Sequence, residues 1–303
     1  MRSDVSFPSA GIGLAGHLYT PADTGPRPGI VIGHPASGVK EQAAAAYAER
    51  LVTAGFVVLT FDAAHQGASG GEPRGLEDPA QRTEDLKAAV SFLTTRPEVD
   101  ADRIGALGIC ASGGYVLPAA AGDHRIRAVA TVSAADIGRQ FRVGADGTQD
   151  PRVIDGMLAA AANARTVEAS GAPARTFEIF PATEEQARAG GEHVFEGWEY
   201  YRTDRAGHPG SAKQFTLSSI DRIVTFDPFA FMPAQPLLMV VGTRAATAWM
   251  TQLAYERARG PKRLHWVEGA THVSLYDRDV PAAATELTTF FTSTLADRAH
   301  STA

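Results

Sequence analysis

Short apolar runs that have the character of buried strands alternate with helical stretches over most of the chain. This alternation is typical of βαβ units, so it predicts an α/β architecture with a mostly parallel central sheet flanked by helices. The predicted strands are residues 29–33, 57–61, 104–109, 129–133, 237–241 and 264–267. The predicted helices are residues 41–54, 79–94, 112–121, 250–258 and 281–295.

The alternation stops between residues 134 and 235, where no strand is predicted. A structureless loop of that length is uncommon in a compact domain, so an inserted helical lid is the better interpretation. We therefore predict one core built from residues 1–134 and 236–303 and a lid built from residues 135–235. The aromatic residues that stand out in this stretch are Phe195, Trp198, Tyr200, Tyr201 and Phe215.

Composition excludes several classes of partner. The chain has 28 basic and 34 acidic residues, a formal net charge of −6, and no Lys/Arg-rich run, which argues against nucleic acid or an anionic membrane. No stretch approaches the roughly 18 apolar residues of a membrane helix, and residues 1–20 lack the apolar region of a signal peptide. The single cysteine, Cys110, excludes an intrachain disulfide and favours a reducing cytoplasm.

The segment after the predicted strand 104–109 has the layout of a nucleophile elbow, a tight strand-to-helix turn. It reads G-I-C-A-S over residues 108–112, with small residues around a central cysteine. The helix N-terminus that follows would lower the pKa of a thiol, so Cys110 is predicted to be a nucleophile. The alternative is a buried cysteine that packs as a small apolar residue. Ser112 lies two residues into the helix, where its side chain is expected to cap the helix.

A nucleophile at this turn needs a base, which is expected in the loop after the last strand. His272 ends the segment G-A-T-H there, and it is the one histidine of nine in that position. It is therefore predicted to be the base, with a solvated loop histidine as the alternative. The backbone N–H groups of Ala111 and Ala36 are predicted to form the oxyanion hole, because Pro35 in the same loop has no N–H group.

Two other patterns carry little weight. Residues 11–16 read G-I-G-L-A-G and match the dinucleotide-binding pattern G-x-G-x-x-G, which should open a helix. The residues that follow predict a strand and a turn, so we expect a hairpin and no nucleotide cofactor. Neither H-E-x-x-H nor a cysteine pair is present, so no metal site is predicted.

Taken together, the motifs resemble one branch of the α/β-hydrolase superfamily, which contains bacterial hydrolases related to dienelactone hydrolase and fungal polyketide transferases. The matching segments are His34-Pro35, Lys40-Glu41-Gln42, Phe61-Asp62, Gln66-Gly67, Gly71-Glu72-Pro73-Arg74, the elbow up to Tyr115, Asp136-Ile137-Gly138, Tyr200-Tyr201-Arg202-Thr203 and Gly269-Ala270-Thr271-His272. The resemblance covers nearly the whole chain. It implies an α/β-hydrolase fold with an inserted lid, a Cys-His-acid site acting on an ester, thioester or similar acyl substrate, and no cofactor.

The acid is where this sequence departs from that branch. Relatives usually carry an Asp where Ala246 stands, and residues 242–249 contain no acid. The superfamily's other position for the acid follows the preceding strand, where Asp136 stands, so Asp136 is predicted to be the third member of the site. The alternative is an N-cap at the start of the lid. A cysteine nucleophile also depends less on an acid, because the thiolate can form an ion pair with His272.

Three classes of function stay open at this point. In the leading hypothesis, Cys110 attacks a carbonyl carbon, His272 shuttles the proton, and water releases the acyl group. A transferase would pass the same acyl group to an alcohol or an amine, and a non-acyl enzyme or binding protein could use the same scaffold. The aromatic lid favours a small apolar, ring-bearing or polyketide-like substrate. The oligomeric state, a homodimer included, is not determined by the sequence.

Overall fold

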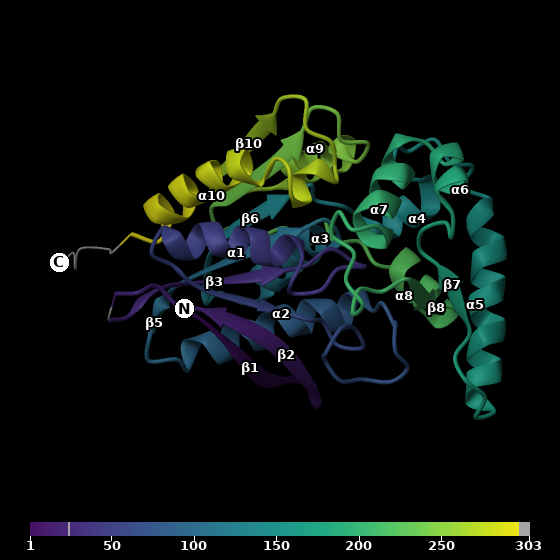
Figure 1. Cartoon of the computed structure of the whole chain (residues 1–303), viewed down its shortest axis with the longest axis horizontal. Coiled ribbons are helices and arrows are strands. Elements are labelled where there is room, and N and C mark those ends of the chain that lie inside the picture. Colours follow the sequence, from purple (N-terminus) through teal and green to yellow (C-terminus); the bar gives the residue numbers. More distant parts are fainter. Residues whose placement is uncertain (24, 297–303) are drawn as a thin grey trace.

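An eight-stranded sheet forms the centre of the computed structural model, which describes residues 1–23 and 25–296 (Figure 1). Its strands are β1 (Arg2–Ser9), β2 (Ile12–Tyr19), β3 (Arg27–Gly33), β4 (Val57–Phe61), β5 (Val99–Ile109), β6 (Ile126–Val132), β9 (Leu237–Gly242) and β10 (Lys262–Val267). Their spatial order is β1-β2-β4-β3-β5-β6-β9-β10. Only the pairs β1–β2 and β2–β4 are antiparallel, so the predicted mostly parallel sheet is confirmed.

Helices cover both faces of the sheet, as Figure 1 shows. On one face lie α1 (Ala43–Thr53) and α10 (Val280–Thr294). On the other lie α2 (Pro79–Thr94), α3 (Ala111–Gly122) and α9 (Ala248–Arg257). Because both faces are covered, the parallel strands are continuous apolar runs rather than alternating ones.

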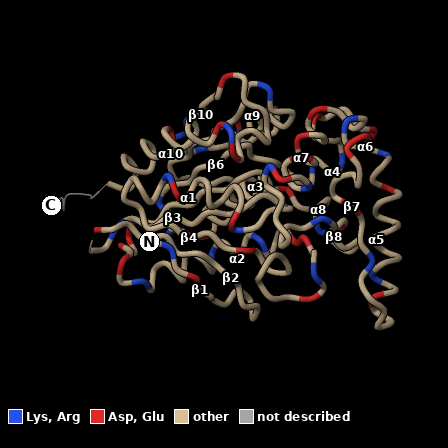
Figure 2. Tube along the Cα trace, in the orientation of Figure 1, with Lys and Arg blue, Asp and Glu red and all other residues tan. Residues whose placement is uncertain are grey.

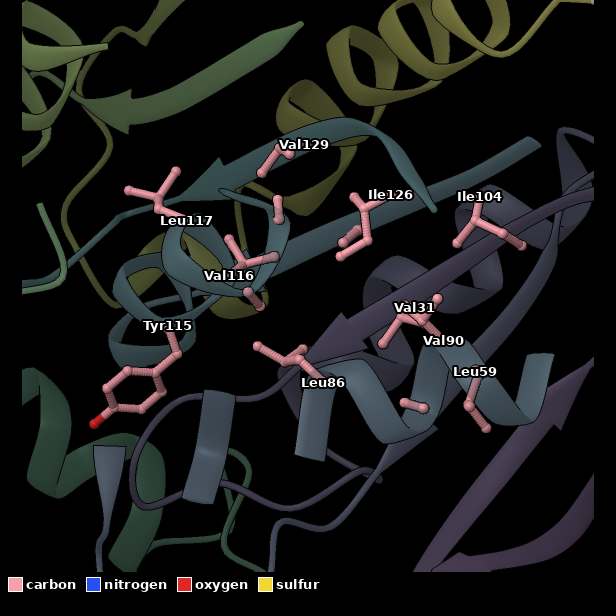
Figure 3. Close-up of a cluster of buried hydrophobic side chains, with 14 of the residues drawn as sticks. Val31, Leu59, Leu86, Val90, Ile104, Tyr115, Val116, Leu117, Ile126 and Val129 are labelled. Carbon is pink, nitrogen blue, oxygen red and sulfur yellow. The ribbon is translucent and has the colours of Figure 1, made fainter. Parts of the chain in front are cut away.

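Strand β3 shows how one run serves two cores. Val31 faces the cluster that contains α2 and α3, whereas Ile30 and Ile32 face the cluster that contains α1 and α10, and all three are fully buried. Figure 3 shows the first cluster, in which Val31 lies near Leu86 of α2. Burying each such side chain stabilises the fold by about 1.5–3 kcal/mol.

The G-x-G-x-x-G pattern lies in a β-hairpin, as predicted. Strands β1 and β2 pair antiparallel from Arg2↔Tyr19 to Ser9↔Ile12. The turn between them consists of Ala10 (φ 46°) and Gly11 (φ 84°), both in the left-handed region of the backbone. The pattern therefore opens a strand rather than a phosphate-binding helix.

The lid enters and leaves the sheet at neighbouring strands, because β6 and β9 are hydrogen-bonded to each other. It contains α4 (Ile137–Val143), α5 (Val153–Ala169), β7 (Thr176–Glu178), α6 (Glu184–Ala189), α7 (Glu192–Arg202), β8 (Gln214–Thr216), the 3-10 turn η1 (Leu217–Ser219) and α8 (Ile220–Val224). Figure 1 shows these elements gathered at one end of the sheet. The antiparallel pair β7–β8 was not predicted, since three-residue strands leave too short a pattern to detect.

Basic and acidic residues are interspersed in both the core and the lid (Figure 2). Among the residues that the structure describes, no helix is long and apolar enough to cross a membrane.

Candidate active site

Cys110 lies between β5 and α3 in a left-handed backbone conformation, with φ 57° and ψ −119°. Such a conformation is strained for a residue with a side chain and is typical of a nucleophile elbow. The turn also needs small neighbours. A Cβ atom on Gly108 would lie 2.0 Å from the carbonyl oxygen of Ser112, and one on Gly113 would lie 2.8 Å from the Cα of Ala134. Glycine at these two positions lets the strand, the turn and the helix approach one another this closely.

Two backbone amides converge on the sulfur of Cys110. The N–H groups of Ala111 and of Ala36 both donate hydrogen bonds to it. Ala111 is the first residue of α3, and Ala36 belongs to the loop that follows β3. The structure therefore brings together the two donors predicted for the oxyanion hole, and they lie beside the predicted nucleophile.

A buried arginine fixes the loop that carries Ala36. Arg82 of α2 donates to the carbonyl oxygen of His34 (2.8 Å), and Ser112 Oγ donates to the same oxygen (2.6 Å). The predicted capping role of Ser112 is wrong, because α3 begins one residue earlier than expected and no side chain caps it. Ser112 instead ties the elbow helix to the oxyanion loop.

The arginine is held in turn by Glu77, whose carboxylate lies 3.7 Å from its Nε atom. Glu77 is fully buried and also accepts hydrogen bonds from Tyr115 (2.7 Å) and Gln66 (2.5 Å). In Figure 3 the Tyr115 hydroxyl points away from the apolar cluster, which fits this bond. Burial raises the pKa of Glu77, while the charge of Arg82 acts in the opposite direction.

His272 lies after β10, as predicted, and both of its ring nitrogens have partners. Nδ1 is hydrogen-bonded to the hydroxyl of Thr247, and Nε2 is hydrogen-bonded to the hydroxyl of Tyr276 at 2.8 Å. Thr247 is fully buried and lies at the end of the loop after β9. A hydroxyl from the residue after Ala246 thus takes the place of the missing carboxylate at Nδ1.

Asp136 is not brought to the imidazole. Its carboxylate accepts from the backbone N–H of Arg139 (2.8 Å) and from the guanidinium of the same residue (3.2 Å), so it is the N-cap of α4. This is the alternative that the sequence left open. Burial raises the pKa of Asp136, although the hydrogen bonds from Arg139 act in the opposite direction. A catalytic role for Asp136 has no support in these contacts.

The nucleophile and the base both favour their neutral forms. Burial raises the pKa of the Cys110 thiol, although the hydrogen bond with Tyr276 and those from the N–H groups of Ala111 and Ala36 act in the opposite direction. Burial and the nearby His193 lower the pKa of His272 well below its ordinary value. The thiol pKa is therefore raised, not lowered as the position at a helix N-terminus led us to expect, because desolvation outweighs the hydrogen bonds that favour the thiolate.

A cavity of about 200 Å³ opens beside Cys110 and is walled by both core and lid. The core contributes Pro35, Ala36, Ser37, Cys110, Ala111, His272, Val273 and Tyr276. The lid contributes Ile137, Gln140, Phe141, Phe177, Ile179, Phe180, His193, Val194, Gly197, Tyr201 and Phe215. The lid therefore lies over Cys110 and supplies most of the apolar wall, with Tyr201 and Phe215 among the aromatics noted in the sequence.

Three residues of the site escaped prediction. Thr247 gives no sequence signal of this role, because a carboxylate rather than a hydroxyl is expected to contact Nδ1. Tyr276 follows His272 by four residues, and the 3-10 turn η2 (Ser274–Tyr276) between them places its hydroxyl against the imidazole. His193 of α7 places its ring 5.1 Å from that of His272, at an interplanar angle of 89°. The contacts of Thr247 and His193 with His272 both depend on the tertiary fold.

Known proteins resemble this chain over most of its length. Residues 14–135 match the model of the Dienelactone hydrolase family. The uncharacterized protein YcjY of Escherichia coli (strain K12) is 41% identical to this chain over 97% of the chain and 100% of its own length. The chain belongs to the dienelactone-hydrolase-like branch of the α/β hydrolases. Its resemblance to that branch of the α/β hydrolases is thereby confirmed, and the protein is a hydrolase or a related acyltransferase.

Two further members of this group span the core and the lid alike. The crystal structure of hypothetical protein PA2218 from Pseudomonas aeruginosa superposes with a TM-score of 0.90, is 32% identical, and covers 97% of this chain and 94% of its own. The acyltransferase drtE of Aspergillus calidoustus is 27% identical over 88% of this chain and 85% of its own length. The similarity of this chain to both proteins therefore includes the lid.

Proposed function

We propose that the protein performs covalent acyl chemistry at Cys110 and hydrolyses an ester or thioester of a small apolar acyl group. The observation that carries the proposal is the meeting of Cys110, the N–H groups of Ala36 and Ala111, and His272 at one wall of an apolar cavity. A nucleophile, two oxyanion donors and a base at one point are the parts that acyl transfer requires.

In the proposed reaction the sulfur of Cys110 attacks the carbonyl carbon, and the thiol proton passes to His272. The carbonyl oxygen becomes an oxyanion that accepts from the two amides. Collapse of this intermediate breaks the bond to the leaving alcohol or thiol, which takes the proton back. Water then attacks the acyl-cysteine in the same way, releasing the acid and the free thiol.

The lining of the cavity supports a neutral acyl group. Among the described residues that line it, none is Lys, Arg, Asp or Glu, and the polar ones are Ser37, Gln140, Cys110, two tyrosines and two histidines. A charged acyl group would lose its hydration there without gaining an opposite charge. Phe141, Phe177 and Phe215 provide aromatic surface that suits an apolar chain or a ring.

A second candidate is transfer of the acyl group to an alcohol or an amine. The observation that favours it is the relative drtE, named an acyltransferase, whose similarity includes the lid. A lid that keeps water from the acyl-enzyme would let a bound acceptor react first. Hydrolysis and transfer share the first half of the reaction and differ only in what attacks the acyl-cysteine.

Intact-mass analysis tests the shared half. The protein would be mixed with p-nitrophenyl esters and N-acetylcysteamine thioesters of acetate, butyrate, octanoate and benzoate. Wild type is expected to gain the mass of one acyl group, Ser112→Ala to gain it as well, and Cys110→Ala to gain none. Labelling of the Cys110→Ala variant, or no labelling of wild type by any of the compounds, would refute the proposal. Chasing the labelled protein with water or with an added alcohol or amine then separates hydrolysis from transfer.

A further inference from the structure

The hydroxyl of Tyr276 lies between the nucleophile and the base. It is hydrogen-bonded to Nε2 of His272 at 2.8 Å and to the sulfur of Cys110. The side chain is 3% exposed and lines the same cavity as its two partners. The nitrogen expected to take the thiol proton therefore contacts a phenol that in turn contacts the thiol.

We propose that Tyr276 is a catalytic residue that relays the proton between Cys110 and His272. This inference rests on the acyl chemistry proposed above and adds a third side chain to it. The site is then a chain of four groups, Cys110, Tyr276, His272 and Thr247, in which each contacts the next.

The relay moves two protons and leaves the phenol unchanged. The S–H bond of Cys110 breaks as a new O–H bond forms on Tyr276, and the original phenol proton moves to Nε2 of His272. The thiolate so formed attacks the carbonyl carbon, and the imidazolium holds the proton that came off. When the leaving alcohol or thiol departs, the same two transfers run backwards, so that the leaving group takes a proton from Tyr276 and Nε2 returns one to the phenol.

A phenol suits this role because its oxygen donates and accepts hydrogen bonds at the same time. Burial, with the nearby Cys110 and tyrosines, raises the pKa of Tyr276 well above its ordinary value, so the phenol stays protonated and passes a proton rather than storing a charge. Thr247 completes the order of the chain. Its hydroxyl can accept from Nδ1–H, which leaves Nε2 free to accept from the phenol.

The phenol is held in place from both the core and the lid. Tyr47 of α1 donates to the carbonyl oxygen of Leu275 (2.6 Å), next to Tyr276 in the chain. The ring of Tyr200, on α7, packs edge-on against the ring of Tyr276 at 5.2 Å. Arg205 donates two hydrogen bonds, of 2.8 and 2.9 Å, to the carboxylate of Asp277. A group fixed this firmly can hold one geometry through the reaction.

The decisive variant is Tyr276→Phe, which keeps the ring and removes the hydroxyl. The rate of acylation by p-nitrophenyl butyrate is expected to fall by roughly 100-fold or more, the range for losing an acid–base group. Tyr200→Phe is the matched control, since it also removes a buried hydroxyl and leaves the ring against Tyr276 in place. The Tyr200 hydroxyl is hydrogen-bonded to the backbone at Ala43 and not to Cys110 or His272. Its rate is expected to stay within about threefold of wild type. Acylation of Tyr276→Phe at the wild-type rate or faster would overturn the relay and make the phenol an obstacle in the cavity.

A measurement on wild type keeps the proposal testable if Tyr276→Phe fails to fold. Acylation rates in mixtures of light and heavy water should curve with the deuterium fraction, because two protons move in one step, and a straight line would refute the relay.

Alkylation of Cys110 by iodoacetamide separates the two proposals, since it needs no acyl substrate. Failure of wild type to form any acyl-enzyme would refute the proposed function alone, whereas equal alkylation rates in wild type and Tyr276→Phe would refute the relay alone.

Discussion

On the core side of the cavity, Cys110, Ala111 and Ala36 are placed by backbone geometry and by side chains with almost no exposure, such as Arg82 (4% exposed) and Glu77 (0%). On the lid side, the wall is placed by ring contacts and by ion pairs that reach solvent. The pair between Arg165 of α5 and Asp221 of α8 is an example, with side chains 43% and 37% exposed.

This difference separates two tasks. A buried ion pair that loses one partner leaves an unpaired buried charge, whereas an exposed pair contributes little. The chemistry of the site is therefore held by contacts that tolerate little change, and the shape of the acyl pocket is held by contacts that tolerate more. The two sides meet at His272, which contacts Thr247 and Tyr276 from the core and His193 from the lid.

The largest expected effect is on the core side. Arg82→Met should lower the free energy of unfolding by about 3–5 kcal/mol, because it leaves Glu77 without its cation. Arg165→Met, in the lid, should lower it by no more than about 1 kcal/mol. Urea unfolding of both variants measures the contrast, and equal losses would show that core and lid are held alike.

The next effect concerns the base. Thr247→Val removes the hydroxyl at Nδ1 of His272 and should lower kcat/KM by roughly 10- to 100-fold, since the tautomer and orientation of the ring are then less well fixed. Thr247→Ser keeps the hydroxyl and is the control. Steady-state kinetics with the best ester of the panel measures both, and wild-type kinetics in Thr247→Val would mean that the hydroxyl does not support the base.

Asp136→Asn distinguishes the two interpretations of Asp136. An asparagine still caps a helix, so activity should change by less than about threefold if the residue acts only as the N-cap of α4. A loss of several orders of magnitude, with an intact fold, would instead make Asp136 part of the catalytic site, as in triads that lose their acid. The same kinetic assay decides between them, with circular dichroism as the check on the fold.

On the lid side, Phe177→Ala should change selectivity more than chemistry. Removing this ring, which contacts Phe141 and Phe215 edge-on, enlarges the cavity and should raise kcat/KM for octanoate over butyrate esters by roughly tenfold. The rate of iodoacetamide alkylation of Cys110 should stay at the wild-type value. A variant that alkylates much more slowly while keeping its chain-length preference would contradict the division between the two sides.

The smallest effect compares two histidines by NMR titration. Burial and the nearby Arg82 lower the pKa of His34, in the core, to about 3. Burial also lowers the pKa of His193, in the lid, although the charge of Asp146 acts in the opposite direction. His34 should therefore keep its neutral signal down to pH 4, and His193 should titrate below the ordinary pKa near 6.5. Since the folded pKa of His34 lies below its unfolded value near 6.5, its stabilising effect is complete above about pH 6.5 and falls by about 1.4 kcal/mol per unit as the pH drops from there. A His34 signal that titrates near pH 6 would contradict this.

Much of the fold was readable from the sequence because its signals are local. The apolar runs predicted the parallel strands to within a few residues, and α2 was predicted at the bounds observed, Pro79–Thr94. The same local patterns place Cys110 between a strand and a helix and His272 between β10 and α10. The β7–β8 pair was missed because its strands are short and pair across 35 or more residues of the lid.

The sequence by itself determined the sheet, the elbow and the order in which the nucleophile and the histidine occur. Only the tertiary structure decided that Thr247 contacts Nδ1, that Asp136 caps a helix, and that Tyr276 lies between Cys110 and His272. It also decided the direction of the Cys110 pKa shift, because burial outweighs the hydrogen bonds that favour the thiolate. The physical reason is that strand periodicity and turn chemistry act over a few neighbouring residues, whereas desolvation and side-chain partners depend on segments that come together only when the chain folds.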